Sequence, residues 1–384
     1  MQLFEILLFG LIALFWTTYG LKLAYGAVRL PWLKHYAPAQ DADCPRISLV
    51  FAARDEERKL GAALETMLAQ DYPNLEVVAV DDRSKDGTSR ILDEFAARYP
   101  QLRVLHVKEL TPGWLGKPHA LQKAYESSSG EWLLFTDADV KFKADTLRRV
   151  ATMVRERKLD HLVLLGDVER TGFWDTVLIT FFGMGFQMAT DLYQVSNPNS
   201  RNYVGVGAFQ MVKRNAYEAS GTHRRLAMEV IDDMKLGKLV KYAGFRSGVG
   251  VAQDAVSVEW HAGLGNLVRG VEKNFFAGAQ FRASVALMQA LSLLIFNVLP
   301  FVGLLSGNGW VRLLAGISVL VALCFHAGGD MVMRVSPLYA ITLPIGAMIF
   351  TYMLLRSTVI TLRQGGIYWR GTFYELEELR KGLV

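Results

Sequence analysis

Four long apolar runs constrain this chain more than any other feature of its sequence. Each run holds at most one charged residue, and together they cover residues 3–21, 285–305, 311–329 and 337–355. Each is close to the roughly 20 residues that a helix needs to cross a bilayer. Four such runs are not typical of the core of a soluble protein, so they predict membrane-spanning helices.

The long segment between the first and second apolar runs has the composition of a globular domain, and its flanks are basic. The basic residues nearest the runs are Lys22, Arg29, Lys34, Arg269, Lys273 and Arg282. Lys and Arg beside membrane spans mark the cytoplasmic side. We therefore expect a multi-pass protein of a bacterial inner membrane with an anchor at 1–28, a cytoplasmic domain at 45–280, transmembrane helices at 285–356 and a tail at 357–384.

Two segments leave the membrane arrangement open. Three spans after a cytoplasmic domain would place the tail outside, yet the tail carries Arg363, Arg370, Arg380 and Lys381, which favour the inside. Either one run is re-entrant or interfacial, or the tail breaks the rule. Residues 173–193 are apolar with charges near both ends, which predicts either an amphipathic interfacial helix or a core helix of the domain.

Charge and cysteine usage narrow the class of protein. The net charge of +5 suits anionic headgroups and an anionic substrate, while the scattered basic residues form no nucleic-acid motif and exclude that partner. The two cysteines, Cys44 and Cys324, lie in different contexts and form no disulfide framework. A reducing compartment suits them.

The segment before residue 170 alternates strand and helix patterns. Strands are predicted at 46–53, 75–80, 102–107, 131–135 and 161–166, with helices at 56–69, 88–99, 117–127 and 144–158. This alternation predicts an α/β domain with a mostly parallel sheet covered on both faces. Ligands of such sheets bind at the carboxyl ends of the strands.

Acidic residues stand where two of these strands end. Asp81 follows the second strand, and Asp137 and Asp139 follow the fourth. Residues two apart at a strand end share a face, and two carboxylates suit one hard cation such as Mg²⁺ or Mn²⁺, with water and phosphate completing its shell. The nearby Asp86-Gly87-Thr88 instead predicts a turn and a helix start.

This combination resembles the family 2 glycosyltransferases, whose nucleotide-sugar-binding domain has the Rossmann-like GT-A fold. The stretch "FAARDEE" (51–57) is similar to the family's opening loop and "VAVDDRSKDGT" (78–88) to its second-strand motif. The resemblance implies that the nucleotide contacts Ala52, Arg54, Glu56 and Asp81. In "TDADV" it implies that Asp137 and Asp139 hold a divalent metal and the diphosphate of a UDP-sugar.

Two further stretches carry the resemblance beyond the donor site. In "GWLGKPHAL" (113–121), Lys117 either contacts the diphosphate or is a solvated residue at a helix start. "EVIDDMKLG" (229–237) resembles the motif that supplies the catalytic base, which implies that role for Asp233, with Asp232 beside it. The two aspartates also suit the start of a helix, and the two interpretations are compatible.

The chain departs from the family at its Gln-x-x-Arg-Trp motif, where it reads "NLVRG". Asn266 and Arg269 remain candidates for diphosphate or acceptor contact, and Trp260, His261 or Trp369 for the place of the missing Trp. "GGIYWRGTFY" (365–374) looks like the tail signature of ceramide glucosyltransferase-like and hopanoid- or carotenoid-associated members. Its Trp-Arg pair either returns to the active site or lies at the headgroup level, and the second is favoured.

These features predict an inverting, metal-dependent glycosyltransferase that moves a hexose from a UDP-sugar to a hydroxyl of a membrane lipid. Three alternatives stay open at this stage. A polyprenyl-phosphate glycosyltransferase needs no base, because its acceptor is already an anion. A processive polysaccharide synthase needs a translocation pore and an acceptor-stacking Trp. A non-catalytic membrane scaffold, whose transferase domain has lost its activity, would not need the acidic residues described above.

Overall fold

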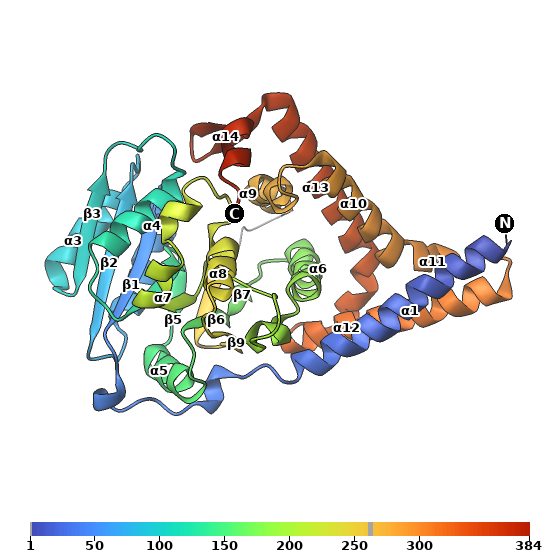
Figure 1. Cartoon of the computed structure of the whole chain (residues 1–384), viewed down its shortest axis with the longest axis horizontal. Coiled ribbons are helices and arrows are strands. Elements are labelled where there is room, and N and C mark those ends of the chain that lie inside the picture. The colour runs from blue at the N-terminus through green and yellow to red at the C-terminus, as the bar shows by residue number, and fades with distance from the viewer. Residues whose placement is uncertain (1, 260–263) are drawn as a thin grey trace. The chain divides into compact units, whose positions relative to one another are not determined.

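The structure, a computed structural model, describes residues 2–259 and 264–384, without the side chains of residues 264, 266, 267, 269 and 271. The described residues divide into two compact units (Figure 1). The helical unit takes the described parts of Met1–Arg29, Arg170–Asp191 and Trp260–Ile367. The α/β unit comprises Leu30–Glu169, Leu192–Glu259 and Tyr368–Val384.

Seven of the described strands form one sheet in the order β3-β2-β1-β4-β8-β6-β9. Their bounds are β1 Ile47–Ala53, β2 Leu75–Asp82, β3 Leu102–Val107, β4 Trp132–Asp137, β6 His161–Leu165, β8 Gln210–Lys213 and β9 Ser247–Val251. β8 runs antiparallel to β4 and β6, and the other neighbours are parallel. The predicted mostly parallel sheet is confirmed.

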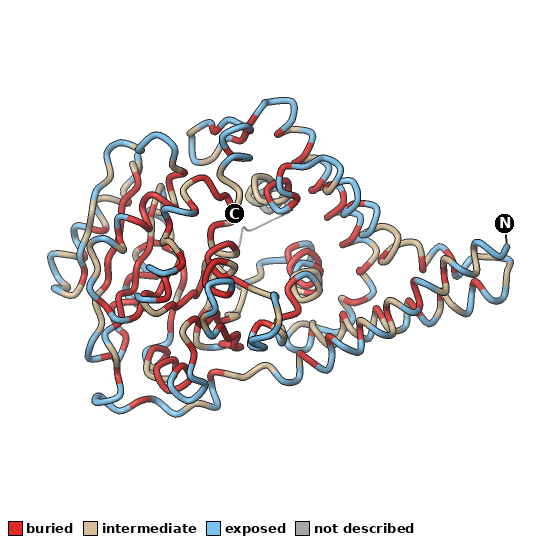
Figure 2. The backbone as a smooth tube through the Cα atoms, in the orientation of Figure 1, coloured by how far each residue is buried: buried red, intermediate tan, exposed pale blue. Residues whose placement is uncertain are grey.

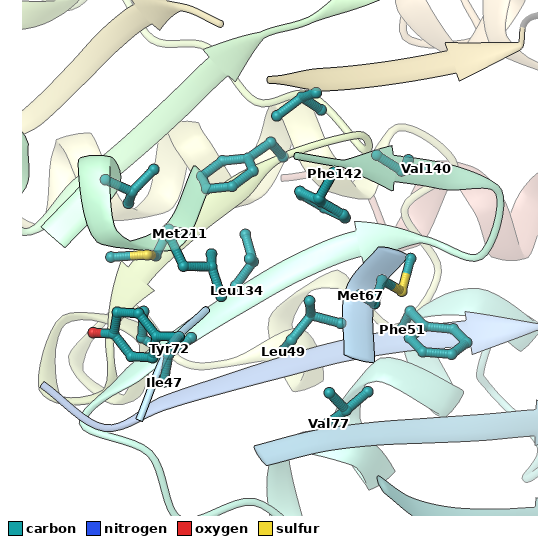
Figure 3. Packing of buried hydrophobic residues seen from close by; sticks show 14 of the residues in the cluster. Ile47, Leu49, Phe51, Met67, Tyr72, Val77, Leu134, Val140, Phe142 and Met211 are labelled. Carbon is teal, nitrogen blue, oxygen red and sulfur yellow. The ribbon is translucent and has the colours of Figure 1, made fainter. Parts of the chain in front are cut away.

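Helices cover both faces of this sheet, which explains why its strands read as unbroken apolar runs. Leu49 and Phe51 pack with Met67 on one face (Figure 3), whereas Val50 packs with Ala120 on the other. Successive residues of a strand point to opposite faces, so in β1 every position except the partly exposed Ala52 is buried. The α-helices of the unit are α2 Glu57–Leu68, α3 Thr88–Arg98, α4 Gly116–Glu126, α5 Thr146–Glu156, α7 Arg214–Ala219, α8 Asp232–Tyr242 and α14 Leu376–Lys381.

Two small sheets complete the strands of the described chain. One has the order β5-β10-β7, and the other pairs β11 with β12. Their bounds are β5 Val140–Phe142, β7 Asp167–Glu169, β10 Val256–Glu259, β11 Gly366–Trp369 and β12 Thr372–Glu375. The segment after β11, predicted only as a tail, folds into the α/β unit: Tyr374, Leu376 and Leu379 are buried there.

The helical unit contains the apolar runs. Its elements are α1 Gln2–Ala27, α6 Phe173–Thr190, α9 Leu264–Gly278, α10 Ala283–Asn297, α11 Leu299–Gly303, α12 Gly309–Val332, the 3₁₀ helix η5 Pro337–Thr342 and α13 Leu343–Gln364. Among the described residues, four helical segments are long and apolar enough to cross a membrane: Gln2–Ala27, Ala283–Gly303, Gly309–Val332 and Pro337–Gln364.

The outer surface of the helical unit is apolar. Leu3, Phe4 and Leu11 of α1 are each at least 65% exposed, and Leu320 of α12 is 64% exposed. Exposed positions recur along both helices (Figure 2). Soluble proteins rarely expose large contiguous apolar surfaces, so this surface suits lipid contact. α6 belongs to this unit and packs against α12 and α13, so it is not a core helix of the α/β unit.

Candidate active site

The carboxyl ends of three neighbouring strands form one edge of the large sheet. In the register of the sheet Ala53 of β1 pairs with Asp81 of β2, and Ala52 pairs with Asp137 of β4. Adjacent strands lie about 4.8 Å apart, so β2 and β4 are separated by about 10 Å across β1. Asp81 and Asp137 therefore lie at the same edge of the sheet, on two strands that are separated by β1.

Asp81 is held in a network of hydrogen bonds. One carboxylate oxygen accepts from the amide of Ser84 at 3.2 Å, and the other accepts from Ser89 Oγ at 2.5 Å and contacts His106 Nδ1 at 3.1 Å. Burial alone would raise the pKa of Asp81, but the hydrogen bonds from Ser84, Ser89 and His106 outweigh it and lower the pKa. The side chain is therefore a charged acceptor with a fixed orientation.

The loop after β1 faces the end of β2 through charged side chains. Arg54 Nη1 lies 3.7 Å from Asp82 Oδ2, and Arg83 Nε donates to Asp82 Oδ1 at 2.7 Å. Asp82 is 3% exposed, so these two guanidinium groups compensate a buried charge. The Glu56 amide donates to Thr88 Oγ1 at 2.8 Å, which ties the loop to the start of α3.

Asp137, at the end of β4, forms an ion pair with Lys117 of α4. Lys117, in the first turn of α4, donates from Nζ to Asp137 Oδ1 at 2.7 Å. Burial would lower the pKa of Lys117, but the charges of Asp137, Asp232 and Asp233 outweigh it and raise the pKa. The solvated interpretation of Lys117 is wrong, because its side chain is only 25% exposed and is held in an acidic cluster.

Asp139 lies in the turn between β4 and β5 rather than in the strand, so it does not share a strand face with Asp137 as predicted. Its carboxylate lies 3.6 Å from Lys59 Nζ, which also donates to the Glu259 carbonyl at 3.0 Å. Burial and the charge of Asp137 together raise the pKa of Asp139 to about 6. The surroundings of Asp139 therefore disfavour its charged form.

These two carboxylates fit a hard divalent cation that draws most of its ligands from elsewhere. Among residues 2–259 and 264–384, no group of three or more His, Cys, Asp or Glu side chains forms a complete metal cage. Mg²⁺ and similar ions are usually held by one or two carboxylates and keep water and substrate phosphates as further ligands. A dication would also offset the repulsion that raises the pKa of Asp139.

Asp232 and Asp233 begin α8 and line a pocket together with Lys117, Gly207 and His223. Asp233 Oδ1 accepts from the amide of Met234 at 2.7 Å. Burial raises the pKa of Asp233, Lys117 opposes this, and the charge of Asp137 adds to it. A carboxylate with a raised pKa in a pocket is suited to accept a proton near neutral pH.

Two glycines bring the acidic groups together by close backbone approach. A Cβ at Gly207 would lie 2.5 Å from Asp137 Oδ2, and one at Gly205 would lie 1.7 Å from the Asp233 carbonyl oxygen. Both distances are too short for a side chain, so these positions need glycine. The backbone of residues 204–209 therefore packs closely against both the end of β4 and the start of α8.

Several predicted residues fall outside the description. Trp260 and His261 lie among the residues that the structure does not describe, and the side chains of Asn266 and Arg269 are likewise outside it. Trp369 ends β11 and is partly buried. Its neighbour Arg370 contacts Arg54 and Glu56, so Arg370 returns to the loop after β1.

Sequence reasoning missed several residues of this site, among them Lys59, Gly207, His223 and Tyr374. His223 is 1% exposed, and burial together with Lys117 lowers its pKa to about 3. It is therefore neutral, and it contacts the Tyr217 hydroxyl at 2.6 Å and lies 3.8 Å from Asp232. Only Gly207 had a signal in the sequence, since "VGVG" (204–207) places two glycines two residues apart.

The sequence of this domain has known relatives. Residues 48–221 match the family described as "Glycosyl transferase family 2". The segment is a family 2 glycosyltransferase domain. The structure of a mannosyltransferase from Pyrobaculum calidifontis, in complex with GDP-Man and Mn²⁺, is similar with a TM-score of 0.51 and 19% identity, over 92% of this chain and 98% of that one. This likeness shows a shared α/β fold of the GT-A type.

Two curated proteins are also similar to this chain in sequence. The beta-monoglucosyldiacylglycerol synthase of Synechocystis sp. is 31% identical over 198 residues, which is 50% of this chain and 39% of the relative. The chain thus spans about two fifths of the length of that protein. The 4,4'-diaponeurosporenoate glycosyltransferase of Staphylococcus aureus is 23% identical over 344 residues, 86% of this chain and 89% of the relative.

Proposed function

We propose that this chain is a membrane-bound, inverting hexosyltransferase that moves a sugar from a UDP-sugar to a hydroxyl of a membrane lipid. The observation that carries the proposal is the convergence of Asp137, Lys117 and Asp233 at the carboxyl edge of the family 2 domain. The two curated relatives are named for a glycolipid and a carotenoid product, which supports a lipid-type acceptor.

The donor half of the proposed site lies at the ends of β1 and β2. Asp81 offers a fixed carboxylate to the N–H of the uracil base, and Ala52, Arg54 and Glu56 line the adjacent loop for the base and ribose. Lys117 supplies a positive charge beside Asp137, where a diphosphate would lie. These groups bind and orient the donor.

The proposed cofactor is Mg²⁺ or Mn²⁺, held by Asp137 and Asp139. When bound, it supplies positive charge that stabilises the leaving diphosphate. The solved mannosyltransferase with the same fold holds Mn²⁺, which supports this choice. Lys117 remains close enough to Asp137 to share the stabilisation of negative charge on the phosphates.

The proposed base is Asp233. A lipid hydroxyl is a poor nucleophile until its proton is removed, and a positioned base contributes about 10²–10⁴ in rate. Asp233 accepts that proton as the hydroxyl oxygen attacks the anomeric carbon from the face opposite the diphosphate, which inverts the configuration. His223 is neutral, so it adds no positive charge to this part of the pocket.

The proposed activity is tested with the purified full chain in detergent. It is incubated with labelled UDP-glucose, UDP-galactose or UDP-N-acetylglucosamine and a total lipid extract, and products are read by mass spectrometry. We expect one UDP-sugar to yield a lipid product that carries one hexose. Release of long polymers would support a polysaccharide synthase instead, and no transfer from any UDP-sugar would contradict the proposal.

We also propose that the α/β unit is cytoplasmic and that the residues after β11 lie on the same side. Basic residues follow α1, as expected at the cytoplasmic face. Tyr374 accepts a hydrogen bond from the Gly116 amide at 3.3 Å, so β12 belongs to the α/β unit and lies on its side of the membrane. An even number of crossings must therefore separate residue 259 from residue 368.

Of the three apolar segments in that interval, we propose that α13 does not cross. Its first end follows η5, where Tyr339 packs on Phe173 with ring centroids 5.5 Å apart. Phe173 begins α6, four residues after Glu169 of the α/β unit. The other end of α13 is Gln364, four residues before Tyr368 of the same unit. A helix of 22 residues is about 33 Å long, so crossing would separate its ends by a whole bilayer.

This arrangement predicts which loops are accessible from outside. Single cysteines are introduced as G307C, S336C and K381C in a chain with C44S and C324S, and intact cells are treated with a membrane-impermeant maleimide. We expect labelling of G307C only, because α10–α11 and α12 cross while α13 stays at the cytoplasmic face. Permeabilised cells, in which all three positions should label, are the control. Labelling of S336C from outside would contradict the arrangement.

A further inference from the structure

The strands β11 and β12 form a hairpin with an unusual residue at its tip. The two connecting residues, Arg370 and Gly371, have φ values of 48° and 75°. A two-residue loop with both φ values positive is the type I′ arrangement, which favours Asn, Asp or Gly at its first position. An arginine there is strained, and such strain persists only where the surroundings impose it.

The surroundings of the Arg370 guanidinium are the loop after β1. Arg370 Nη1 donates to the carbonyl oxygen of Arg54 at 2.6 Å, and Nη2 is paired with the Glu56 carboxylate. Between those two residues, Asp55 has a φ of 55°, so this loop is itself strained. The forked guanidinium thus fixes both ends of a strained three-residue turn, which a single-point donor could not do.

The same hairpin contacts two further segments beside the site. Tyr374 of β12 is 6% exposed, and its hydroxyl accepts from the Gly116 amide at the start of α4. The pKa of Arg83 is raised chiefly by its hydrogen bond to Asp82, with a smaller contribution from Tyr374. The hairpin therefore touches the loop after β1, the end of β2 and the residue before Lys117.

We propose that this hairpin is a positioning element of the donor site, and that Arg370 acts by holding the turn from Arg54 to Glu56 in the shape that receives the nucleotide. The inference rests on the proposed function, because it assigns that turn to nucleotide binding. A direct consequence is that the affinity for the donor depends on Arg370, although it lies more than 300 positions after Arg54 and Glu56 in the chain. The acceptor and the base are left unaffected.

The test uses Arg370→Asn in the full chain. Asn adopts positive φ more readily than Arg, so the hairpin should keep or gain stability while the contacts to Arg54 and Glu56 are lost. We expect the KM for the UDP-sugar and the Kd for UDP to rise about tenfold, since each lost hydrogen bond contributes about 0.5–1.5 kcal/mol. kcat should change less than about twofold, because Asp233 is not touched.

Two further variants sharpen the test. Arg370→Lys keeps the positive charge but lacks the second N–H group that allows both contacts, so it should raise the KM by an intermediate factor. Lys381→Asn, on the exposed face of α14, is the control and should match wild type. A wild-type KM and Kd in Arg370→Asn would overturn the inference, as would a lowered Tm without a change in donor affinity. Wild type that neither binds UDP nor transfers sugar would overturn the proposed function, and this inference with it.

Discussion

Replacing Asp233 by Asn is expected to lower kcat for sugar transfer by about 10²–10⁴, the usual contribution of a positioned general base. The KM for the donor should change little, because the proposed donor contacts are Asp81 and the loop after β1. The melting temperature should stay or rise, since burial disfavours the charged carboxylate that the substitution removes. Turnover is measured with saturating UDP-sugar and lipid.

The pH dependence of kcat is a second test of the role of Asp233. The base works only when ionised, so wild-type kcat should fall as the pH drops through the raised pKa of Asp233. The acidic limb should therefore lie above the value of about 4 that is usual for Asp. In Asp233→Asn this limb should be absent from the residual activity.

Asp145→Asn is the matched control, because it removes a carboxylate from a surface ion pair with Arg149. Such pairs contribute about 0–1 kcal/mol to stability, and kcat should match wild type. If Asp233→Asn kept nearly full turnover, Asp233 would not be the base. A polyprenyl-phosphate acceptor, which needs no base, would then become the better interpretation.

Replacing Asp137 by Asn is expected to reduce transfer on the order of 100-fold in limiting Mn²⁺, because the substitution removes a proposed metal ligand that is also the ion-pair partner of Lys117. Excess Mn²⁺ should restore part of the activity by mass action. In wild type, EDTA should abolish transfer, and added Mn²⁺ or Mg²⁺ should recover it. The measurement is the initial rate against metal concentration.

Asp86→Asn serves as the control for this series. Asp86 Oδ1 accepts from the Thr88 amide at 3.0 Å in the turn before α3, as the sequence predicted, and Asn can make the same bond. Its metal dependence should equal that of wild type. An Asp137→Asn enzyme with the same metal requirement as wild type would remove Asp137 from the metal site.

The fold was largely predictable because its signals are local. The strands that carry Asp81 and Asp137 near their carboxyl ends are short apolar runs, since both faces of the sheet are covered, and turn residues mark their ends. The rule that parallel strands present their carboxyl ends at one edge then places the two carboxylates together. The four apolar runs likewise form helices, as their length and their apolar composition predict.

The rest of the site depends on contacts between distant parts of the chain. Tyr374 and Gly116 are 258 positions apart, and no local pattern connects them. Asp139 was placed on a strand face because its spacing from Asp137 fits one, yet the chain turns at that point. Lys59, on α2, meets Asp139 only because α2 packs beside β5. Such contacts follow from tertiary packing, which periodicity does not encode.

Calorimetric titration of UDP into the purified full chain, with Mn²⁺ and with EDTA, tests the central claim most directly. If carboxylates from separate strands hold a dication that binds the diphosphate, UDP should bind with Mn²⁺ and lose at least about 90% of its affinity in EDTA, which is about 1.4 kcal/mol. At the Mn²⁺ concentration that just saturates wild type, Asp137→Asn should show the weak affinity both with Mn²⁺ and with EDTA. Equal affinity of wild type with Mn²⁺ and with EDTA would contradict the account.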